Sequence, residues 1–375
     1  MVVHQLNFQD NSGWDYSSIQ GESLDYQLII VFGSRELLSS AGWFQSLRKK
    51  FLKSDIVSVS TSGNILGSEV SDDSLVASLL YFGKTRVKTT MTNISSLESS
   101  REAGIILGSM LQDSKLQHVM VFSEGIKVNG SELVSGLNEV IQVPVTGGLA
   151  GDAARFEKTL VGLNSLPESG NIVGIGFYGE SLKVGFGHFG GWDSFGPERR
   201  VTKSDHNILY ELDNKSALEL YKTYLGDKAK ELPGSALLFP LGMRVKPNDP
   251  ILTRTILTIN PDGGMVFAGD LPEGAMVQLM KANFEKLIDA SATAAEQTLS
   301  VVGADSEFAL LISCVGRKLV LGQRIEEEVD AVRDVLGEFP KMSGFYSYGE
   351  ISTVLETPSC ELHNQTMTIT VMKEE

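Results

Sequence analysis

The sequence predicts an α+β protein of two domains, each a mixed or antiparallel sheet with packed helices. Three observations lead to this class. Short apolar runs typical of strands occur in both halves of the chain, with amphipathic helical patterns between them. These patterns do not alternate strictly, as they would in a parallel α/β sheet. The length of 375 residues also exceeds that of one average domain.

The N-terminal half begins with a polar and aromatic stretch, residues 1–24, that we expect to be a tail. Apolar runs and alternation then predict strands, and amphipathic spacing predicts helices. The predicted strands lie at 27–32, 56–61, 74–82, 86–91 and 118–122, and the predicted helices at 36–52, 97–114 and 130–141. A glycine-rich, strand-like region continues to residue 212, and a short helix follows at 216–225.

A charged segment that ends in Pro-Gly, residues 227–235, predicts a linker between domains at 25–226 and 236–375. The second half repeats the mixture of strands and helices. Strands are expected at 236–239, 253–259, 264–267, 308–313 and 319–321, and helices at 276–299 and 325–336. A closing strand is expected over 360–371.

Composition restricts the kind of partner and the compartment. The net charge is −15, which argues against a nucleic-acid surface or an anionic-membrane surface. Two cysteines without a CxxC spacing fit a reducing compartment. No signal peptide is recognisable, and no apolar run approaches the roughly 20 residues that span a bilayer. We therefore expect a cytoplasmic protein that neither binds nucleic acid nor inserts into a membrane.

The closing segment carries the strongest functional signal. If residues 360–371 form one strand, His363, Gln365 and Met367 share one face with further apolar residues. Polar groups on such a face need partners, which are supplied either by the protein or by a ligand. A loop with Tyr348 and Glu350 lies just upstream. We therefore predict a pocket at this strand, with His363 either hydrogen-bonded in the core or free to ligate haem iron.

Further motifs support less specific predictions. Gly185–Gly190 satisfies GxGxxG, but the following Gly-Trp-Asp sequence and Pro197 cannot form the helix of a dinucleotide site. Cys314 precedes Arg317, so the thiol is either activated by the cation or simply buried. The Gly147-Gly148 segment either exposes amides to an anion or forms a structural turn.

Several of these motifs together resemble the FIST family. Phe345-Tyr-Ser-Tyr-Gly-Glu350 followed by Leu362-His-Asn-Gln-Thr366 resembles the signature that closes the FIST C-terminal domain. Gly191-Trp192 with Phe195-Gly-Pro197, and the central Pro144–Asp152 loop, resemble the FIST N-terminal domain. The resemblance extends over roughly residues 25–372. One departure is Asn214, where the family usually has glycine after the aspartate, which changes a turn.

The resemblance implies a cytoplasmic sensory module of signal transduction that binds a small ligand such as an amino acid. Some stand-alone members are haem proteins that sense nitric oxide and regulate a histidine kinase, but the closing motif does not separate them from other members. We expect haem b as a candidate cofactor, with His363 as the iron ligand and with His188, His206 or His118 as substitutes. The expected ligand-binding residues are His363, Gln365, Asn364, Tyr348, Glu350, Arg317, Cys314, Gly147 and Gly148.

Two other readings of the same residues stay open. In the first, Cys314, Arg317, Glu350 and His363 converge into an enzyme site, which requires the thiol and a base within hydrogen-bonding reach. In the second, the protein is a structural interaction module without an enclosed pocket near His363. We expect a sensor rather than an enzyme, because the sequence holds no complete catalytic motif.

Overall fold

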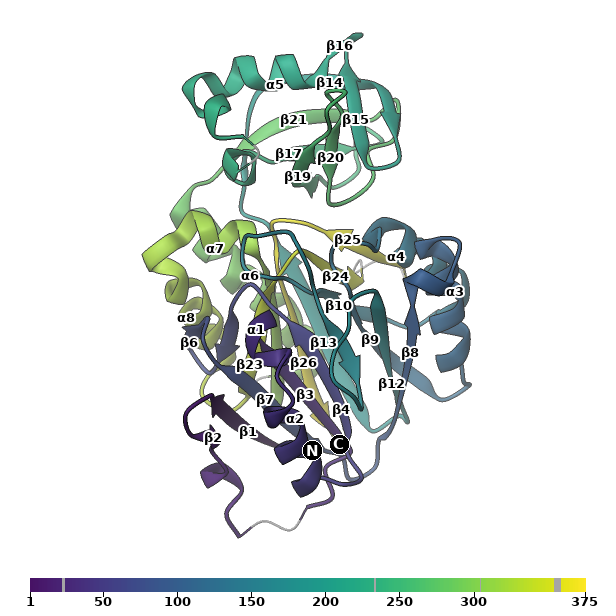
Figure 1. The fold of residues 1–375 in the computed structure, drawn as a ribbon, viewed down its shortest axis with the longest axis vertical. Coiled ribbons are helices and arrows are strands. Elements are labelled where there is room, and N and C mark those ends of the chain that lie inside the picture. Colours follow the sequence, from purple (N-terminus) through teal and green to yellow (C-terminus); the bar gives the residue numbers. More distant parts are fainter. Residues whose placement is uncertain (22–23, 233, 304, 354–358) are drawn as a thin grey trace.

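The computed structural model describes residues 1–21, 24–232, 234–303, 305–353 and 359–375. The chain forms two spatial units (Figure 1). A large body is made by residues 1–192 together with residues 282–375, and three sheets build it. A small unit, residues 193–281, is inserted between a strand and a helix of the body and contains a fourth sheet. In Figure 1 the small unit stands above the body.

The first sheet of the body has the order β11-β4-β3-β7-β1-β2. Its strands are β1 (Val2–Gln9), β2 (Gly13–Trp14), β3 (Leu28–Gly33), β4 (Asp55–Ser60), β7 (Leu75–Tyr81) and β11 (Val161–Leu163). β3 and β4 are parallel, and α1 (Arg35–Leu38) and α2 (Gly42–Lys50) connect them. Trp43 and Leu47 of α2 pack in a cluster on the outer face of this sheet.

The second sheet has the order β25-β24-β10-β9-β12-β8 and combines strands from both ends of the chain. Its strands are β8 (Arg86–Asn93), β9 (Leu116–Ser123), β10 (Val145–Leu149), β12 (Asn171–Tyr178), β24 (Gly349–Thr353) and β25 (Cys360–His363). The parallel pair β9 and β10 is connected by α4 (Gly130–Val140), which packs with α3 (Ser100–Leu111) on the outer face.

The third sheet has the order β13-β26-β22-β23-β5-β6. Its strands are β5 (Asn64–Leu66), β6 (Glu69–Ser71), β13 (Leu182–Phe189), β22 (Phe308–Cys314), β23 (Lys341–Ser347) and β26 (Met367–Glu374). The parallel pair β22 and β23 is connected through α7 (Val315–Leu321) and α8 (Ile325–Leu336). α8 and α6 (Phe284–Val302) cover its outer face.

The inner faces of the three sheets meet in one apolar core. Each sheet contributes an aromatic ring to its centre: Phe32, Phe122 and Phe345. The rings of Phe32 and Phe345 stack with centroids 4.8 Å apart, and Phe122 meets Phe32 edge-on at 5.8 Å. Aromatic pairs of this kind stabilise the core by more than the burial of their apolar area alone. The body is therefore built around one shared core that includes residues from both halves of the sequence.

The small unit is an antiparallel sheet with one helix against it, α5 (Ala217–Leu225). Its order is β18-β17-β21-β14-β15-β20-β19, with β16 beside β15. The strands are β14 (Asp193–Asp205), β15 (Ile208–Leu212), β16 (Lys215–Ser216), β17 (Leu241–Arg244), β18 (Leu252–Arg254), β19 (Ile256–Ile259), β20 (Met265–Phe267) and β21 (Met276–Lys281). The short 3-10 helices η3 (Gly226–Glu231) and η4 (Gly234–Leu238) follow α5.

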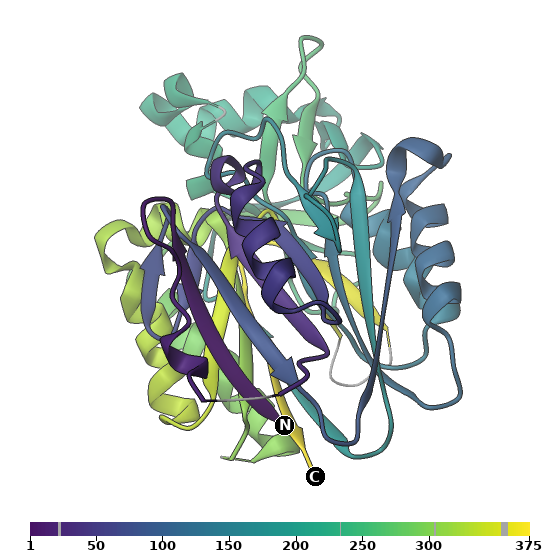
Figure 2. The ribbon, with the colours of Figure 1, turned by 60° about the horizontal axis from the view of Figure 1, so that its bottom comes forward.

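The predicted class is confirmed, because mixed or antiparallel sheets with packed helices make up both units. The expected N-terminal tail is wrong: β1 lies within the first sheet, between β7 and β2 (Figure 2). Val3 packs into the central core, whereas Leu6 and Phe8 pack on the opposite side of the sheet. Because both faces of this strand are covered, the sequence shows no clear alternation.

Other differences concern the second half of the chain. The helix expected over 276–299 is a strand, β21, followed by α6, whose N-cap Asn283 accepts a hydrogen bond from the Lys286 amide. Residues 319–321 belong to α7 rather than to a strand. The expected linker at 227–235 lies inside the small unit, where η3 occupies most of it, and residue 233 is outside the described residues. No helix among the described residues has the length and apolarity to cross a membrane.

Candidate ligand-binding site

The main candidate site is a pocket of about 450 Å³ between the body and the small unit. This volume lies in the range of small-molecule sites, roughly 300–1,000 Å³. The body contributes His188, Phe189, Gly190, Gly191, Trp192, Gln297, Glu361, His363 and Thr366, and the small unit contributes Ser194, Pro250, Ile251, Leu252, Thr253 and Met280. Phe189 and Ile251 are each almost half exposed and come from opposite units. A ligand in this pocket would contact both.

Two histidines lie side by side in the pocket wall. The ring centroids of His188 and His363 are 4.1 Å apart, and the ring planes are inclined by 33°. His188 comes from β13 in the third sheet, and His363 ends β25 in the second. Among the described residues, neither Nδ1 of His188 nor Nε2 of His363 has a hydrogen-bond partner, although both atoms are buried. Such buried groups normally have one.

In a neutral histidine ring one nitrogen carries the proton and the other carries a lone pair. Nε2 of His363 has no hydrogen-bond partner among the described residues, so it offers a free lone pair when the proton is on Nδ1. Such a lone pair can accept a hydrogen bond or ligate a metal.

Both imidazoles are neutral. Burial lowers the pKa of His363 well below its ordinary value, and the nearby His188 and Arg254 lower it further. Burial likewise lowers the pKa of His188. Arg254 remains charged, since burial lowers its pKa only to about 10. Its guanidinium donates to three backbone carbonyls, those of Asp270, Thr253 and Leu362.

Glu361 supplies a carboxyl group to the same pocket. Burial raises the pKa of Glu361, while the nearby Arg254 opposes that rise. The pocket wall therefore combines two neutral imidazoles with one acidic group, and the cationic Arg254 lies buried behind it. Among the described residues, no group of three or more histidine, cysteine, aspartate or glutamate side chains is placed to hold a bare metal ion.

The closing segment does not form the single strand expected from its alternation. β25 ends at His363 in the second sheet, and β26 begins at Met367 in the third. Gln365 between them has a φ of 62°, which reverses the chain. The predicted common face is therefore wrong: His363 lines the pocket, whereas Met367 is buried in the core under α6 and α8.

The side chains of Asn364 and Gln365 make hydrogen bonds around this chain reversal. Asn364 Nδ2 donates to the His363 carbonyl, and its Oδ1 has no partner among the described residues. Gln365 Nε2 donates to the Leu237 carbonyl of the small unit at 3.2 Å. The Gln365 carbonyl accepts from Trp192 Nε1 at 2.9 Å. Neither amide lines the pocket, so both lie behind the wall that His363 forms.

Arg317, expected to bind ligand, is committed to a buried ion pair. Its side chain is fully buried, and it donates to Glu328 Oε2 through Nε at 3.0 Å and Nη2 at 2.8 Å. It also donates to the carbonyls of Gly190 and Leu287 and to the Ser291 hydroxyl. All of these partners belong to the body. Arg317 therefore stabilises the core, and its link to Gly190 fixes one edge of the pocket.

Cys314 is buried at the end of β22. Burial raises the pKa of its thiol far above the ordinary value, and the Glu350 carboxylate raises it further. The thiol is therefore not the thiolate that nucleophilic catalysis requires. Glu350 itself is buried, and burial raises its pKa to about 8. It accepts hydrogen bonds from Ser347 Oγ, Thr366 N and Thr366 Oγ1, so it supports the pocket wall from behind.

Tyr348, Gly147 and Gly148 lie away from this pocket. The Tyr348 hydroxyl donates to Asp152 and to the Ala153 carbonyl, and its ring lines a separate pocket of about 200 Å³. Gly147 and Gly148 belong to β10, which pairs with β9 on one side and β24 on the other. Both edges of this strand are occupied, so the expected exposed amides for an anion are not present there.

The remaining candidate histidines are also outside the pocket. His118 is fully buried beside Thr146 Oγ1, and burial lowers its pKa to about 3. His206 is exposed and occupies the turn between β14 and β15 with a φ of 50°. The Gly185–Gly190 motif lies in β13 and its end, where Gly187 lets the strand approach the Ala294 carbonyl of α6. That placement agrees with the rejection of a dinucleotide site.

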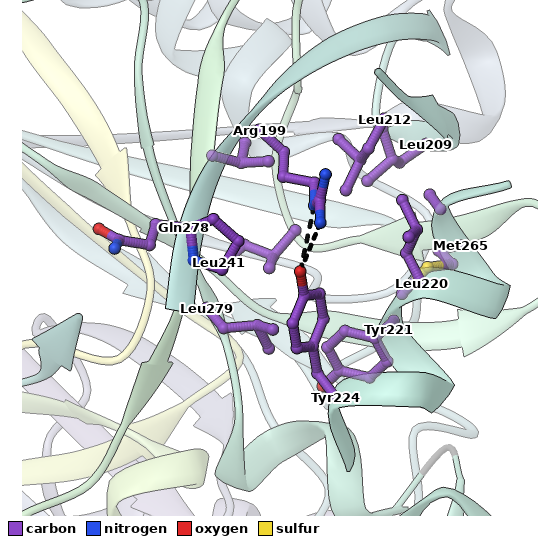
Figure 3. Close-up of a pocket in the computed structure, with 13 residues that line it drawn as sticks. Arg199, Leu209, Leu212, Leu220, Tyr221, Tyr224, Leu241, Met265, Gln278 and Leu279 are labelled. Carbon is purple, nitrogen blue, oxygen red and sulfur yellow. Dashed lines mark hydrogen bonds between the residues drawn. The ribbon is translucent and has the colours of Figure 1, made fainter. Parts of the chain in front are cut away.

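A further cavity lies within the small unit, between α5 and the sheet (Figure 3). In Figure 3 the guanidinium of Arg199 points toward the Tyr224 hydroxyl, which accepts from Nη2 at 2.6 Å. The cavity holds only about 20 Å³, and the rest of its lining is mainly apolar. That is room for about one water molecule. It is a packing defect of the small unit rather than a ligand site.

Comparison with known families identifies the chain. The FIST N domain matches residues 27–215, and the FIST C domain matches residues 217–353. The protein belongs to the FIST family. FIST domains are sensor domains of signal transduction that bind small ligands. The boundary between the two domain matches falls near residue 216, inside the small unit. The FIST N and FIST C segments of this protein therefore both contribute strands to the body.

The FIST protein is also similar to an uncharacterized protein of Methanocaldococcus jannaschii. The two are 23% identical over 248 residues, which cover 58% of this chain and 47% of that relative. The chain thus spans about half the length of the curated relative it matches.

Sequence reasoning identified His363 but not the whole pocket. His188 was expected only as a substitute iron ligand, and Trp192, Gln297 and Ile251 were not expected at all. His188, Ile251, Gln297 and His363 are far apart in the sequence, and only the folded chain brings them together. An exposed Phe189 next to glycines and a tryptophan was the one local signal that could have indicated a pocket rim.

Proposed function

We propose that this FIST protein is a cytoplasmic sensor whose ligand binds in the pocket between the body and the small unit. The observation that carries this proposal is Nε2 of His363, a buried nitrogen in the wall of that pocket that has no partner among the residues the structure describes. A ligand that bonds to this atom would remove the cost of burying it unpaired, about 1–3 kcal/mol. The sensor would pass its state to a partner protein, for which a histidine kinase is our candidate.

We propose haem b as the ligand and His363 as the residue that holds its iron. The donor chemistry fits, because haem requires one neutral imidazole with an available lone pair and an apolar slot. Trp192, Ile251, Leu252 and Met280 supply apolar walls beside the histidine. When bound, haem would supply an iron centre that takes up a gas such as nitric oxide. His188 would stay near that centre as a second neutral imidazole.

An absorption spectrum of the protein from haem-replete cells tests this proposal. We expect a Soret band that shifts with nitric oxide, and its loss or strong weakening in His363→Ala while circular dichroism stays native. His206→Ala is the matched control, since His206 is an exposed histidine away from the pocket. A colourless protein that also fails reconstitution with haemin would contradict the haem assignment. Full haem retention in His363→Ala but not in His188→Ala would move the iron ligand to His188.

A histidine kinase partner requires a separate test. We expect the haem-loaded protein to change the autophosphorylation rate of its cognate kinase in a manner that depends on nitric oxide. The His363→Ala protein should not produce this dependence. An unchanged rate with every candidate kinase from the same organism would contradict the partner assignment and leave the haem assignment standing.

An amino-acid-like ligand is the second candidate, because an acidic group lines the pocket. Glu361 lies in the wall, and the cationic Arg254 is buried behind it, close enough to oppose the rise in the pKa of Glu361. The ammonium group of an amino acid could pair with Glu361. Thermal unfolding with each of the common amino acids tests this alternative. A rise in the unfolding temperature that disappears in Glu361→Gln would favour it over haem.

We also propose that the protein is not an enzyme that uses Cys314. The raised pKa of this thiol and its burial both oppose attack on a substrate. Cys314→Ala should therefore leave ligand binding and signalling unchanged. Loss of signalling in a folded Cys314→Ala protein would reopen the enzyme hypothesis.

A further inference from the structure

The segment Leu362–Thr366 connects the pocket wall to the small unit. His363 and Thr366 line the pocket. On one side of His363, the Leu362 carbonyl accepts from Arg254 Nη1 of the small unit at 3.1 Å. On the other side, Gln365 Nε2 donates to the Leu237 carbonyl of the small unit at 3.2 Å. The ligand-facing histidine therefore stands between two hydrogen bonds that cross from the body to the small unit.

The same segment is anchored to the body at its far end. Glu350 accepts from the amide and the hydroxyl of Thr366 at 3.2 and 2.9 Å, and the Cys314 amide donates to the Thr366 carbonyl. Trp192, which donates to the Gln365 carbonyl, lines the pocket and also belongs to the connection between the body and the small unit. A displacement of His363 would thus be resisted at Thr366 and passed on at Gln365 and Trp192.

The conformation of Gln365 suits a segment with two arrangements. A φ of 62° is uncommon for a residue other than glycine and is held only by its surroundings. Both Oδ1 of Asn364 and Oε1 of Gln365 are buried without a partner within the described residues. An arrangement that paired these oxygens would recover the cost of burying them unpaired, and a segment with two such arrangements can carry a switch.

We infer that Leu362–Thr366 transmits occupancy of the pocket to the small unit, and that Gln365 is the transmitting residue. This inference rests on the proposed ligand pocket but not on the identity of the ligand. A group that bonds to His363 would shift the reversal at Gln365. The shift would change the bond to Leu237 and with it the position of η4 and β17. The small unit would then present a different surface to a partner.

Hydrogen exchange of the peptide that covers residues 234–244 tests the inference without any ligand. The proteins compared are wild type, His363→Ala, Gln365→Met and the double variant. We expect His363→Ala to speed exchange in this peptide about fivefold, the effect of losing one hydrogen bond of ordinary strength. In the Gln365→Met background the same change should have no further effect. His363→Asn, which keeps a polar group in the wall, is measured alongside in case the alanine variant does not fold.

Ser131→Ala is the matched control. Ser131 Oγ accepts from the Asp270 amide, which is another contact between the units and makes no direct hydrogen bond to Leu362–Thr366. This variant should leave the effect of His363→Ala on residues 234–244 intact. Equal effects of His363→Ala in the wild-type and Gln365→Met backgrounds would overturn the inference, and so would the absence of any effect on residues 234–244.

Haemin is then added as the probe of occupancy. We expect it to alter exchange of residues 234–244 in wild type, whereas Gln365→Met should bind haemin with an unchanged Soret band and show no such alteration. Haemin that binds both proteins and alters both equally would overturn transmission through Gln365. Failure of haemin to bind wild type would contradict only the haem assignment. The ligand-free exchange comparison of the four proteins would still test transmission through Gln365.

Discussion

Replacing Arg317 with methionine tests whether this residue is part of the core rather than of the ligand site. The substitution keeps most of the aliphatic stem but removes a guanidinium that makes five hydrogen bonds inside the body. Glu328 would then be a buried carboxylate without its cation, and its remaining donors within the described ranges would be the hydroxyls of Ser313, Tyr346 and Ser291. Breaking a buried pair in this way costs about 3–5 kcal/mol.

Urea unfolding followed by far-UV circular dichroism measures this cost. The double variant Arg317→Met with Glu328→Gln removes both charges, so we expect it to be more stable than the sum of the single effects predicts, by roughly 1–3 kcal/mol. Arg324→Met is the matched control, because its pair with Glu327 is exposed and should contribute little. A loss below about 1 kcal/mol in Arg317→Met would refute the argument that this ion pair stabilises the core.

Three further outcomes are expected. Burial raises the pKa of Glu350 to about 8, so its contribution to stability is fully present below its ordinary pKa near 4.5 and is lost as the pH rises through about 8. Glu350→Gln should flatten this part of the urea stability profile, and an identical pH dependence in both proteins would contradict the assignment. Gly147→Ala should cost about 3 kcal/mol or more in urea unfolding, since its φ is 148° and an added Cβ would lie 1.9 Å from the Val121 carbonyl oxygen. Gly42→Ala, where a Cβ meets nothing within 4 Å, should cost little, and equal losses at the two positions would contradict the steric argument. Cys314 should react with iodoacetamide at neutral pH only after unfolding, because burial keeps its thiol protonated. Rapid alkylation of the native protein, read by mass spectrometry, would be the contrary result.

Helices and strands whose apolar residues follow one clear period were predictable from the sequence. The apolar runs that became β3, β4 and β9 were recognised within a few residues, and so were the helices α4 and α8. Each has one consistent pattern of apolar residues over its length. The pairing of these strands was not predictable, because strands from the two halves, such as β10 and β24, lie side by side.

The wrong predictions arose where a periodic pattern of apolar residues continued across the boundary between two elements. Met276 and Met280 keep helical spacing with the residues of α6, yet they belong to β21, and the break at Asn283 carries no glycine or proline. The alternation of the closing segment likewise continues across Gln365, whose left-handed backbone has no signal in a Gln-Thr sequence. The candidate site was predictable only in part. His363 was identified from its apolar neighbours in the sequence, but its contact with His188 could not be predicted because the two residues lie on different sheets.

The insertion of the small unit also sets an order for folding during synthesis. Residues 193–281 are contiguous, so their sheet can close once residue 281 has left the ribosome. The third sheet of the body, in contrast, contains β5 near residue 65 and β26 near residue 370, and β13 pairs along its length with β26. The body must therefore wait for the end of the chain, with the apolar faces of its earlier strands still unpaired. During that interval those strands are the part of the nascent protein that most needs chaperone protection.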